Sequence, residues 1–151
     1  MVVITGGSTG IGRVIARELA RRGDVVVLVY LGSQRDADDA VQEILGATGT
    51  AMAIRADVRD DLDVERLFTE AAAAFGGIDV IVHTEPRSAA LDRYAASRLR
   101  GGGTVLHLTE VSDLAREFRS YATRSDRSVR TAPDAADLVL ALVERWRRDL
   151  G

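Results

Sequence analysis

Residues 5–12 have the sequence TGGSTGIG, and this glycine-rich stretch lies between a short apolar run at residues 2–4 and a stretch of helical period. Such a turn suits the pyrophosphate of a dinucleotide, because the helix N-terminus supplies amide donors and the positive end of the helix dipole. Gly6 permits the tight turn, Gly10 lets the backbone approach the ligand, and Gly12 lets helix and strand pack closely. We favour the interpretation that this turn binds a dinucleotide over the alternative that it is a strand–helix connection without a ligand. The residues predicted to bind the ligand are Gly6, Ser8, Thr9, Gly10, Ile11 and Gly12.

Apolar runs alternate with amphipathic stretches along the rest of the chain. The runs are continuous and rich in β-branched residues, as in parallel strands that are buried on both faces. Alternation of strands and helices predicts an α/β fold with a doubly wound parallel sheet of about five strands and three layers. The predicted strands are residues 2–4, 25–30, 51–55, 78–82 and 104–108, and the predicted helices are 11–22, 35–46, 61–75 and 88–98.

The C-terminal segment predicts one more helix. Pro133 suits its first turn, with Asp134 beside it, where a negative charge is favourable. Residues 121–130 are polar and predict a loop or short edge element, with a further short strand near Val129 as an option. The apolar face of the predicted helix consists of Leu138, Val139, Leu142, Val143 and Trp146.

The composition is that of a globular protein, and it excludes several kinds of chemistry. The 151 residues carry a net charge of −3, with 46% apolar and 28% charged residues, which suits one domain. The chain has no cysteine and no lysine, so thiol nucleophiles, zinc–thiolate sites and Schiff-base chemistry are excluded. Without an apolar run of bilayer length or a signal peptide, and with mild acidity, we expect a cytoplasmic protein that binds neither membranes nor nucleic acid.

With its glycine-rich turn at residues 5–12, the sequence resembles the short-chain dehydrogenase/reductase family. The turn matches that family's TGxxxGIG pattern rather than the commoner GxGxxG. Three further stretches are similar to segments of the family: ADV at residues 56–58, GGIDVIV at 76–82 and GGGTVLHL at 101–108. The resemblance is strongest over residues 1–82, weaker over residues 98–110 and weakest in the final helix.

This resemblance implies a Rossmann-type fold with the strands in the order 3-2-1-4-5. Residues 1–151 would form a single truncated NAD(P)-binding domain. Asp57 and Val58 would contact the adenine of a nicotinamide dinucleotide, and the expected activity is that of an oxidoreductase. The chain is much shorter than an ordinary family member, and the segments that normally form the substrate pocket are the ones we expect to be missing. Shortened helices would leave apolar surface, which favours a homo-oligomer or a partner chain.

The end of the second predicted strand favours NADP(H) over NAD(H). NAD enzymes of this topology usually carry an acid there, which bonds the ribose hydroxyls. Residues 30–35 contain no acid, and Ser33 and Arg35 can meet a 2′-phosphate, with Arg13 as a further basic candidate. The alternative is that Arg35 is a solvated residue next to an acidic helix, in which case NAD or no cofactor binds.

The catalytic pattern of the family is incomplete in this chain. Its reductases use asparagine, serine, tyrosine and lysine, and this chain contains neither asparagine nor lysine. Tyr94 begins YAASR, which is similar to the family's YxASK, but it precedes the fifth predicted strand instead of following it. Tyr121 lies at nearly the expected distance after that strand, where Thr109 and Glu110 take the place of the usual serine pair. We favour the register in which residues 101–108 form the fifth strand.

Two histidines supply another candidate site. His83 and His107 are predicted near the carboxyl ends of neighbouring strands, where α/β folds place ligands, with Glu85 and Glu110 close by. They suit general acid–base catalysis at neutral pH, but ordinary hydrogen bonds at strand ends are the reading we favour. Their spacing matches no metal-binding motif.

Three functions stay open on the sequence alone. The first is a divergent oxidoreductase that binds NADP(H) and has a degraded catalytic site. The second is a pseudoenzyme that binds a nucleotide or a partner without turnover. The third is a non-redox enzyme, such as a dehydratase, isomerase or cyclase, that uses the histidines and Glu110. The candidate catalytic residues are Tyr94, Tyr121, His83, His107, Thr109 and Glu110.

Overall fold

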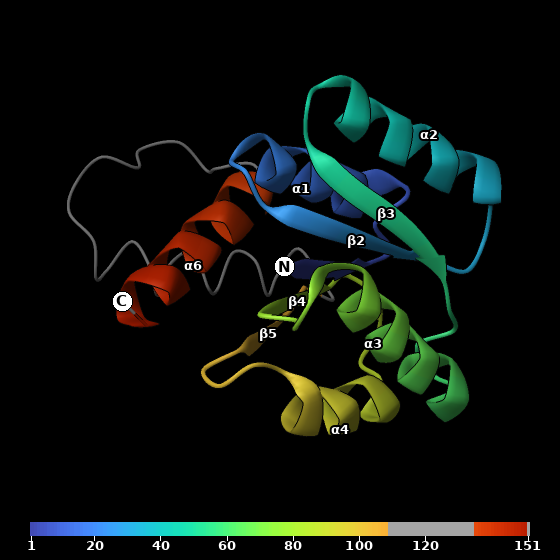
Figure 1. The fold of residues 1–151 in the computed structure, drawn as a ribbon, viewed down its shortest axis with the longest axis vertical. Helices are drawn as coiled ribbons and strands as arrows, with labels where there is room; N and C mark the ends of the chain where they lie inside the picture. Colours follow the sequence, from blue (N-terminus) through green and yellow to red (C-terminus); the bar gives the residue numbers. More distant parts are fainter. Residues whose placement is uncertain (109–134, 151) are drawn as a thin grey trace.

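The computed structural model describes residues 1–108 and 135–150, which form a central parallel sheet with helices on both faces (Figure 1). The strand order is β3-β2-β1-β4-β5, which confirms the predicted order. The strands are β1 (Val2–Thr5), β2 (Val25–Tyr30), β3 (Thr50–Arg55), β4 (Val80–His83) and β5 (Thr104–His107). The helices are α1 (Gly10–Arg21), α2 (Gln34–Gly46), α3 (Asp61–Phe75), α4 (Ala89–Arg98) and α6 (Ala135–Leu150).

Alternate side chains of the strands enter two separate cores. Val2 and Ile4 of β1 pack with α1, α2 and α6, whereas Val3 packs with α3 and α4. Successive side chains of a strand point to opposite faces, so a strand covered on both faces needs an apolar residue at nearly every position. The continuous runs at residues 2–4 and 25–30 meet that need, which is why they predicted the sheet correctly.

Helix α6 packs on the same face of the sheet as α1 and α2. Leu140 and Val143 are buried in that core. Ion pairs of Glu144 with Arg22 and of Arg147 with Asp24 join α6 to the end of α1 and the loop after it. No helix in residues 1–108 or 135–150 is long and apolar enough to span a bilayer.

Most element boundaries agree with the prediction to within one residue, and two regions differ. The strand predicted at residues 78–82 begins at Val80, because Ile78 lies in the preceding loop, where its carbonyl accepts a hydrogen bond from the Arg100 amide. The last helix is described from Ala135 onward. The predictions at residues 121–130, at Val129 and at Pro133 and Asp134, and the side chains of Leu138, Val139, Leu142 and Trp146, lie outside what the structure describes.

Candidate functional site

Three loops meet at the edge of the sheet where the parallel strands end. They are the glycine-rich turn after β1, the loop after β3 at residues 56–60, and the loop after β4 at residues 84–88. In α/β folds this edge is where ligands bind, because loops from neighbouring strands form a crevice there. The sequence-predicted nucleotide residues and the two histidines all lie at or beside this edge.

The glycine-rich turn has the shape that its sequence predicts. Gly6 and Gly10 have φ angles of +62° and +52°, in the left-handed region that glycine adopts without strain. A Cβ at Gly12 would lie 2.1 Å from the carbonyl oxygen of Gly6, so α1 packs directly on the turn. A Cβ at Gly10 would meet no atom within 4 Å, which leaves that side of the turn open to a ligand.

The N-terminus of α1 carries no side-chain cap. Its N-cap residue, Thr9, makes no side-chain hydrogen bond, and the first turn contains no acid. By contrast, Ser33, Asp60 and Ser88 cap α2, α3 and α4 by accepting hydrogen bonds from backbone amides. Asp60 caps α3 in this way directly before Asp61, the first residue of the helix. Since the first amides of a helix have no partners within it, those of α1 are left for an anion.

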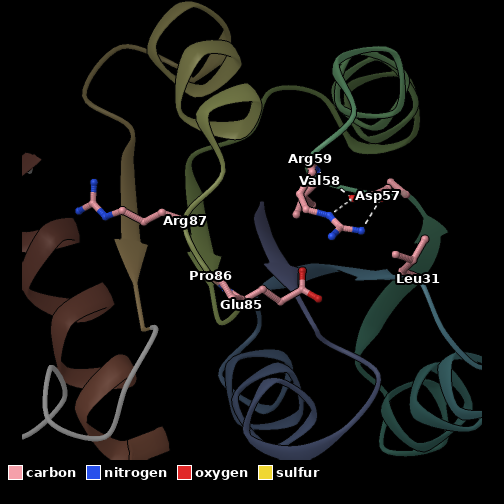
Figure 2. Close-up of a pocket in the computed structure, with 8 residues that line it drawn as sticks. Leu31, Asp57, Val58, Arg59, Glu85, Pro86 and Arg87 are labelled. Atoms are coloured by element: carbon pink, nitrogen blue, oxygen red, sulfur yellow. Dashed lines mark hydrogen bonds and ion pairs between the residues drawn. The ribbon is translucent and has the colours of Figure 1, made fainter.

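A cavity of about 260 Å³ lies beside this turn, at the ends of β2, β3 and β4 (Figure 2). Asp57 and Val58, the residues predicted to contact adenine, both line it. A space of this size, bounded by apolar side chains and a few polar groups, suits a flat heterocyclic base. The cavity is lined by Leu31, Ala56, Asp57, Val58, Arg59, Glu85, Pro86 and Arg87.

Asp57 and Arg59 form a two-pronged ion pair at the mouth of the cavity. Arg59 Nε lies 3.0 Å from Asp57 Oδ1, and Nη2 lies 2.9 Å from Oδ2. These side-chain bonds, with a further bond from the Arg59 amide, lower the pKa of Asp57 to about 2. Asp57 is therefore ionised at neutral pH and can only accept hydrogen bonds. Sequence reasoning missed Arg59, although an arginine two residues after an aspartate within a turn was a usable signal.

The three residues predicted to meet a 2′-phosphate have different surroundings. Ser33 Oγ accepts the Asp36 amide at 3.2 Å, which leaves its hydroxyl proton free to donate to a ligand. Arg35 is exposed and makes no ion pair with any residue that the structure describes. Arg13, however, donates to Glu43 at 3.0 Å, so it is engaged between α1 and α2.

His83 is completely buried, and both of its ring nitrogens are bonded. Its Nε2 lies 2.9 Å from the carbonyl oxygen of Pro86, which can only accept, so Nε2 carries the proton. Its Nδ1 therefore accepts from the hydroxyl of Thr5 at 2.7 Å, and that oxygen accepts the Thr84 amide at 3.1 Å. This network joins the end of β1 to the loop after β4.

His107 lies next to His83, as predicted, with ring centroids 5.5 Å apart and the rings edge to face. Its Nε2 is 3.1 Å from Asp92 Oδ1 of α4. Its Nδ1 is buried and has no hydrogen-bond partner in the described parts of the chain. Burial lowers the pKa of His107 against the opposing charge of Asp92. Within the same residues no three histidine or acidic side chains gather around a common metal position.

The other catalytic candidates do not meet this group in the described structure. Tyr94 lies on α4 and packs against Phe68 of α3, with ring centroids 6.1 Å apart and the guanidinium of Arg98 over its ring. It is partly buried there and does not line the cavity. Residues 104–107 form β5 beside β4, which confirms the place predicted for the fifth strand. Thr109, Glu110 and Tyr121 lie outside the described residues.

Comparisons with known proteins agree with the sequence and the fold. The family model for short chain dehydrogenases matches residues 1–90. The short chain dehydrogenase claC of Passalora fulva is 45% identical over 82 residues, which are 54% of this chain and 31% of that protein. The short-chain dehydrogenase/reductase homolog YusS of Bacillus subtilis is 39% identical over 83 residues, which are 55% of this chain and 76% of that protein.

The solved structures point the same way. A putative dehydrogenase from Burkholderia cenocepacia with bound NADP superposes with a TM-score of 0.63 at 26% identity, over 70% of this chain and 50% of that one. The chain thus spans about a third of the matched curated dehydrogenase from Passalora fulva and half of this solved one. Its glycine turn, its strand order and these matches show that the chain belongs to the short-chain dehydrogenase/reductase family.

Proposed function

We propose that this chain binds a nicotinamide dinucleotide across the glycine-rich turn and the neighbouring cavity, as the cofactor-binding unit of an oxidoreductase. The observation that carries the proposal is the uncapped N-terminus of α1 beside a cavity that Asp57 and Val58 line. The first feature suits the pyrophosphate and the second suits the adenine. The bound NADP of the Burkholderia relative supports the same ligand class.

We propose further that NADP(H) binds ahead of NAD(H). The end of β2 offers Leu31 to the cavity, where an NAD enzyme would have an acid for the ribose hydroxyls. In this proposal Ser33 and Arg35, at the start of α2, would meet the 2′-phosphate. In support, neither side chain is bonded to an acidic side chain in the described residues. Arg13 is left out of this proposal because Glu43 engages it.

The proposed oxidoreductase chemistry is limited by the residues that this chain lacks. A bound nicotinamide would supply hydride transfer, and the protein would supply position and protons. The chain has no asparagine or lysine, and Tyr94 packs against Phe68 away from the cavity. Positioned acid–base groups contribute roughly 10²- to 10⁴-fold to rate, so we expect binding with little carbonyl reduction by these residues alone. A partner chain or a second copy that completes the site is part of the proposal.

Calorimetric titration with NADPH and NADH tests the binding proposal. We expect NADPH to bind at micromolar concentration and more tightly than NADH. Gly10→Trp should weaken NADPH binding at least about a hundredfold, because the indole would fill the open approach to α1. Gly23→Trp is the matched control: Gly23 also has a positive φ and open space, but it lies at the other end of α1. Equal binding by both variants, or no binding of NADPH by the natural sequence, would refute the proposal.

A second candidate is acid–base catalysis by His107 without a nicotinamide. The observation that favours it is the arrangement of His107, with Asp92 on Nε2 and a buried, unbonded Nδ1 among the described residues. An acidic partner on one ring nitrogen leaves the other as a base. His83 is a weaker candidate, because both of its nitrogens are bonded within the fold.

Asp92→Asn tests this second candidate. Asp92 raises the pKa of His107, so its removal should lower that pKa further below the usual value, as followed by NMR titration of the imidazole. Turnover measured without nicotinamide should vanish in His107→Ala. In Asp92→Asn, the acidic limb of the pH–rate profile should move to lower pH. A His107 pKa that does not respond to Asp92→Asn would exclude the pair.

A further inference from the structure

Glu85 places a carboxylate over the first glycine of the turn. A Cβ built on Gly6 would lie 3.6 Å from Cγ of Glu85 and 3.9 Å from its carboxylate carbon. Figure 2 shows the side chain reaching from the end of β4 toward Arg59 and Leu31, across the cavity that these residues share. The carboxylate therefore lies between the turn and the part of the cavity formed by Asp57 and Val58.

This carboxylate has no neutralising partner within the described chain. Glu85 is half-buried, and it makes neither a hydrogen bond nor an ion pair with any described residue. Arg59 is close enough for the charge of Glu85 to contribute to the raised pKa of its guanidinium. The guanidinium, however, is committed to Asp57 through two side-chain bonds. The other arginine of the cavity lining, Arg87, extends away from Glu85 (Figure 2). Among the described residues, one negative charge thus faces the cavity and the turn without an ion-pair partner.

A dinucleotide that binds in the cavity and over the glycine-rich turn at once would lie beside this charge. Adenine in the cavity and phosphates over the glycine-rich turn would leave Glu85 beside the diphosphate. Two like charges a few ångströms apart in a half-buried site repel strongly, because solvent screens them only in part. The carboxylate must turn away before the phosphates can bind, and that movement weakens binding.

We propose that Glu85 limits how tightly the site binds the diphosphate of a dinucleotide, and that it leaves the binding of an unphosphorylated nucleoside unaffected. This inference rests on the proposed nucleotide site and deepens it. It assigns to one side chain a limit on affinity that the uncapped helix N-terminus alone does not impose. The contrary role, in which the carboxylate accepts hydrogen bonds from the ribose hydroxyls, predicts the opposite effect of removing its charge.

Calorimetry with NADPH and adenosine on Glu85→Gln separates these roles. We expect Glu85→Gln to bind NADPH about tenfold more tightly than the natural sequence and to bind adenosine with unchanged affinity. The matched control is Glu70→Gln, which removes the same charge from the exposed face of α3, where Glu70 pairs with Arg66. The control should leave both affinities unchanged. The gain for NADPH should shrink between about 0.05 and 0.5 M salt, because salt screens a charge interaction.

The other outcomes overturn the inference. Weaker binding of both adenosine and NADPH by Glu85→Gln would show that the carboxylate holds the ribose. Equal NADPH affinity in Glu85→Gln and the natural sequence would show that the charge has no role, while the proposed nucleotide site would stand. Absence of NADPH and adenosine binding in all three proteins, each folded by circular dichroism, would overturn the nucleotide site and this inference together.

Discussion

Gly12→Ala should lower the free energy of unfolding by about 3 kcal/mol or more and abolish nucleotide binding. The new Cβ would lie 2.1 Å from the carbonyl oxygen of Gly6 and 3.1 Å from the Cα of Gly7. These are backbone atoms, so no side-chain rotation relieves the overlap, and either α1 or the turn has to move. The higher helix propensity of alanine offsets only about 1 kcal/mol of the loss in unfolding free energy. Urea unfolding followed by circular dichroism measures the loss.

Gly46→Ala is the control for this substitution. Gly46 is also helical, at the end of α2, and a Cβ there would meet no atom within 4 Å. We expect its unfolding free energy to be unchanged or to rise by up to about 1 kcal/mol. If both alanine variants unfold like the natural sequence, the close contact between α1 and the turn is not needed for the fold.

His83→Phe should lower the free energy of unfolding by about 2–4 kcal/mol. The phenyl ring can fill the space but leaves the Thr5 hydroxyl and the Pro86 carbonyl without the bonds that His83 makes at 2.7 and 2.9 Å. His83 and Thr5 are both fully buried, so water cannot cheaply replace the bond between them, whereas Pro86 is exposed. Denaturant unfolding of the variant measures the cost.

A double-mutant cycle with Thr5→Val is the control for the His83 network. Because the two side chains share a hydrogen bond, the combined variant should lose less free energy than the sum of the two single variants. Additive losses would mean that the bond between Thr5 and His83 contributes nothing. A His83→Phe variant as stable as the natural sequence would reopen His83 for a catalytic role.

The sheet and the glycine turn were predictable because their signals are local and periodic. A strand buried on both faces requires a continuous apolar run, and residues 25–30 supply one of six residues that became β2 without change. Positive φ angles at Gly6 and Gly10 follow from a tight turn between strand and helix. The helix predicted at residues 61–75 became α3 without change, and its cap at Asp60 acts within four residues.

The partners of charged side chains were not predictable, because they come from elements far apart in the chain. Arg13 was a phosphate candidate until the structure placed Glu43, thirty positions later in sequence, against it. Glu85 was expected near the histidines, but the sequence does not tell toward which loop its carboxylate turns. Asp92, in the middle of α4, contacts His107 in β5, and no spacing rule links those two positions in the sequence.

The central place of β1 has a consequence for how the chain folds. Its register pairs Val2 with Val80 and Thr5 with His83, positions 78 residues apart. β1 and β4 can form their hydrogen bonds only after the long segment between them has closed into a loop. Parallel sheets whose paired strands are this far apart in sequence fold slowly. Until residues 80–83 are synthesised, one edge of β1 stays unpaired, and unpaired apolar edges attract other chains. The yield of folded protein should therefore depend on the rate of this closure, and expression at lower temperature and concentration should favour it over aggregation.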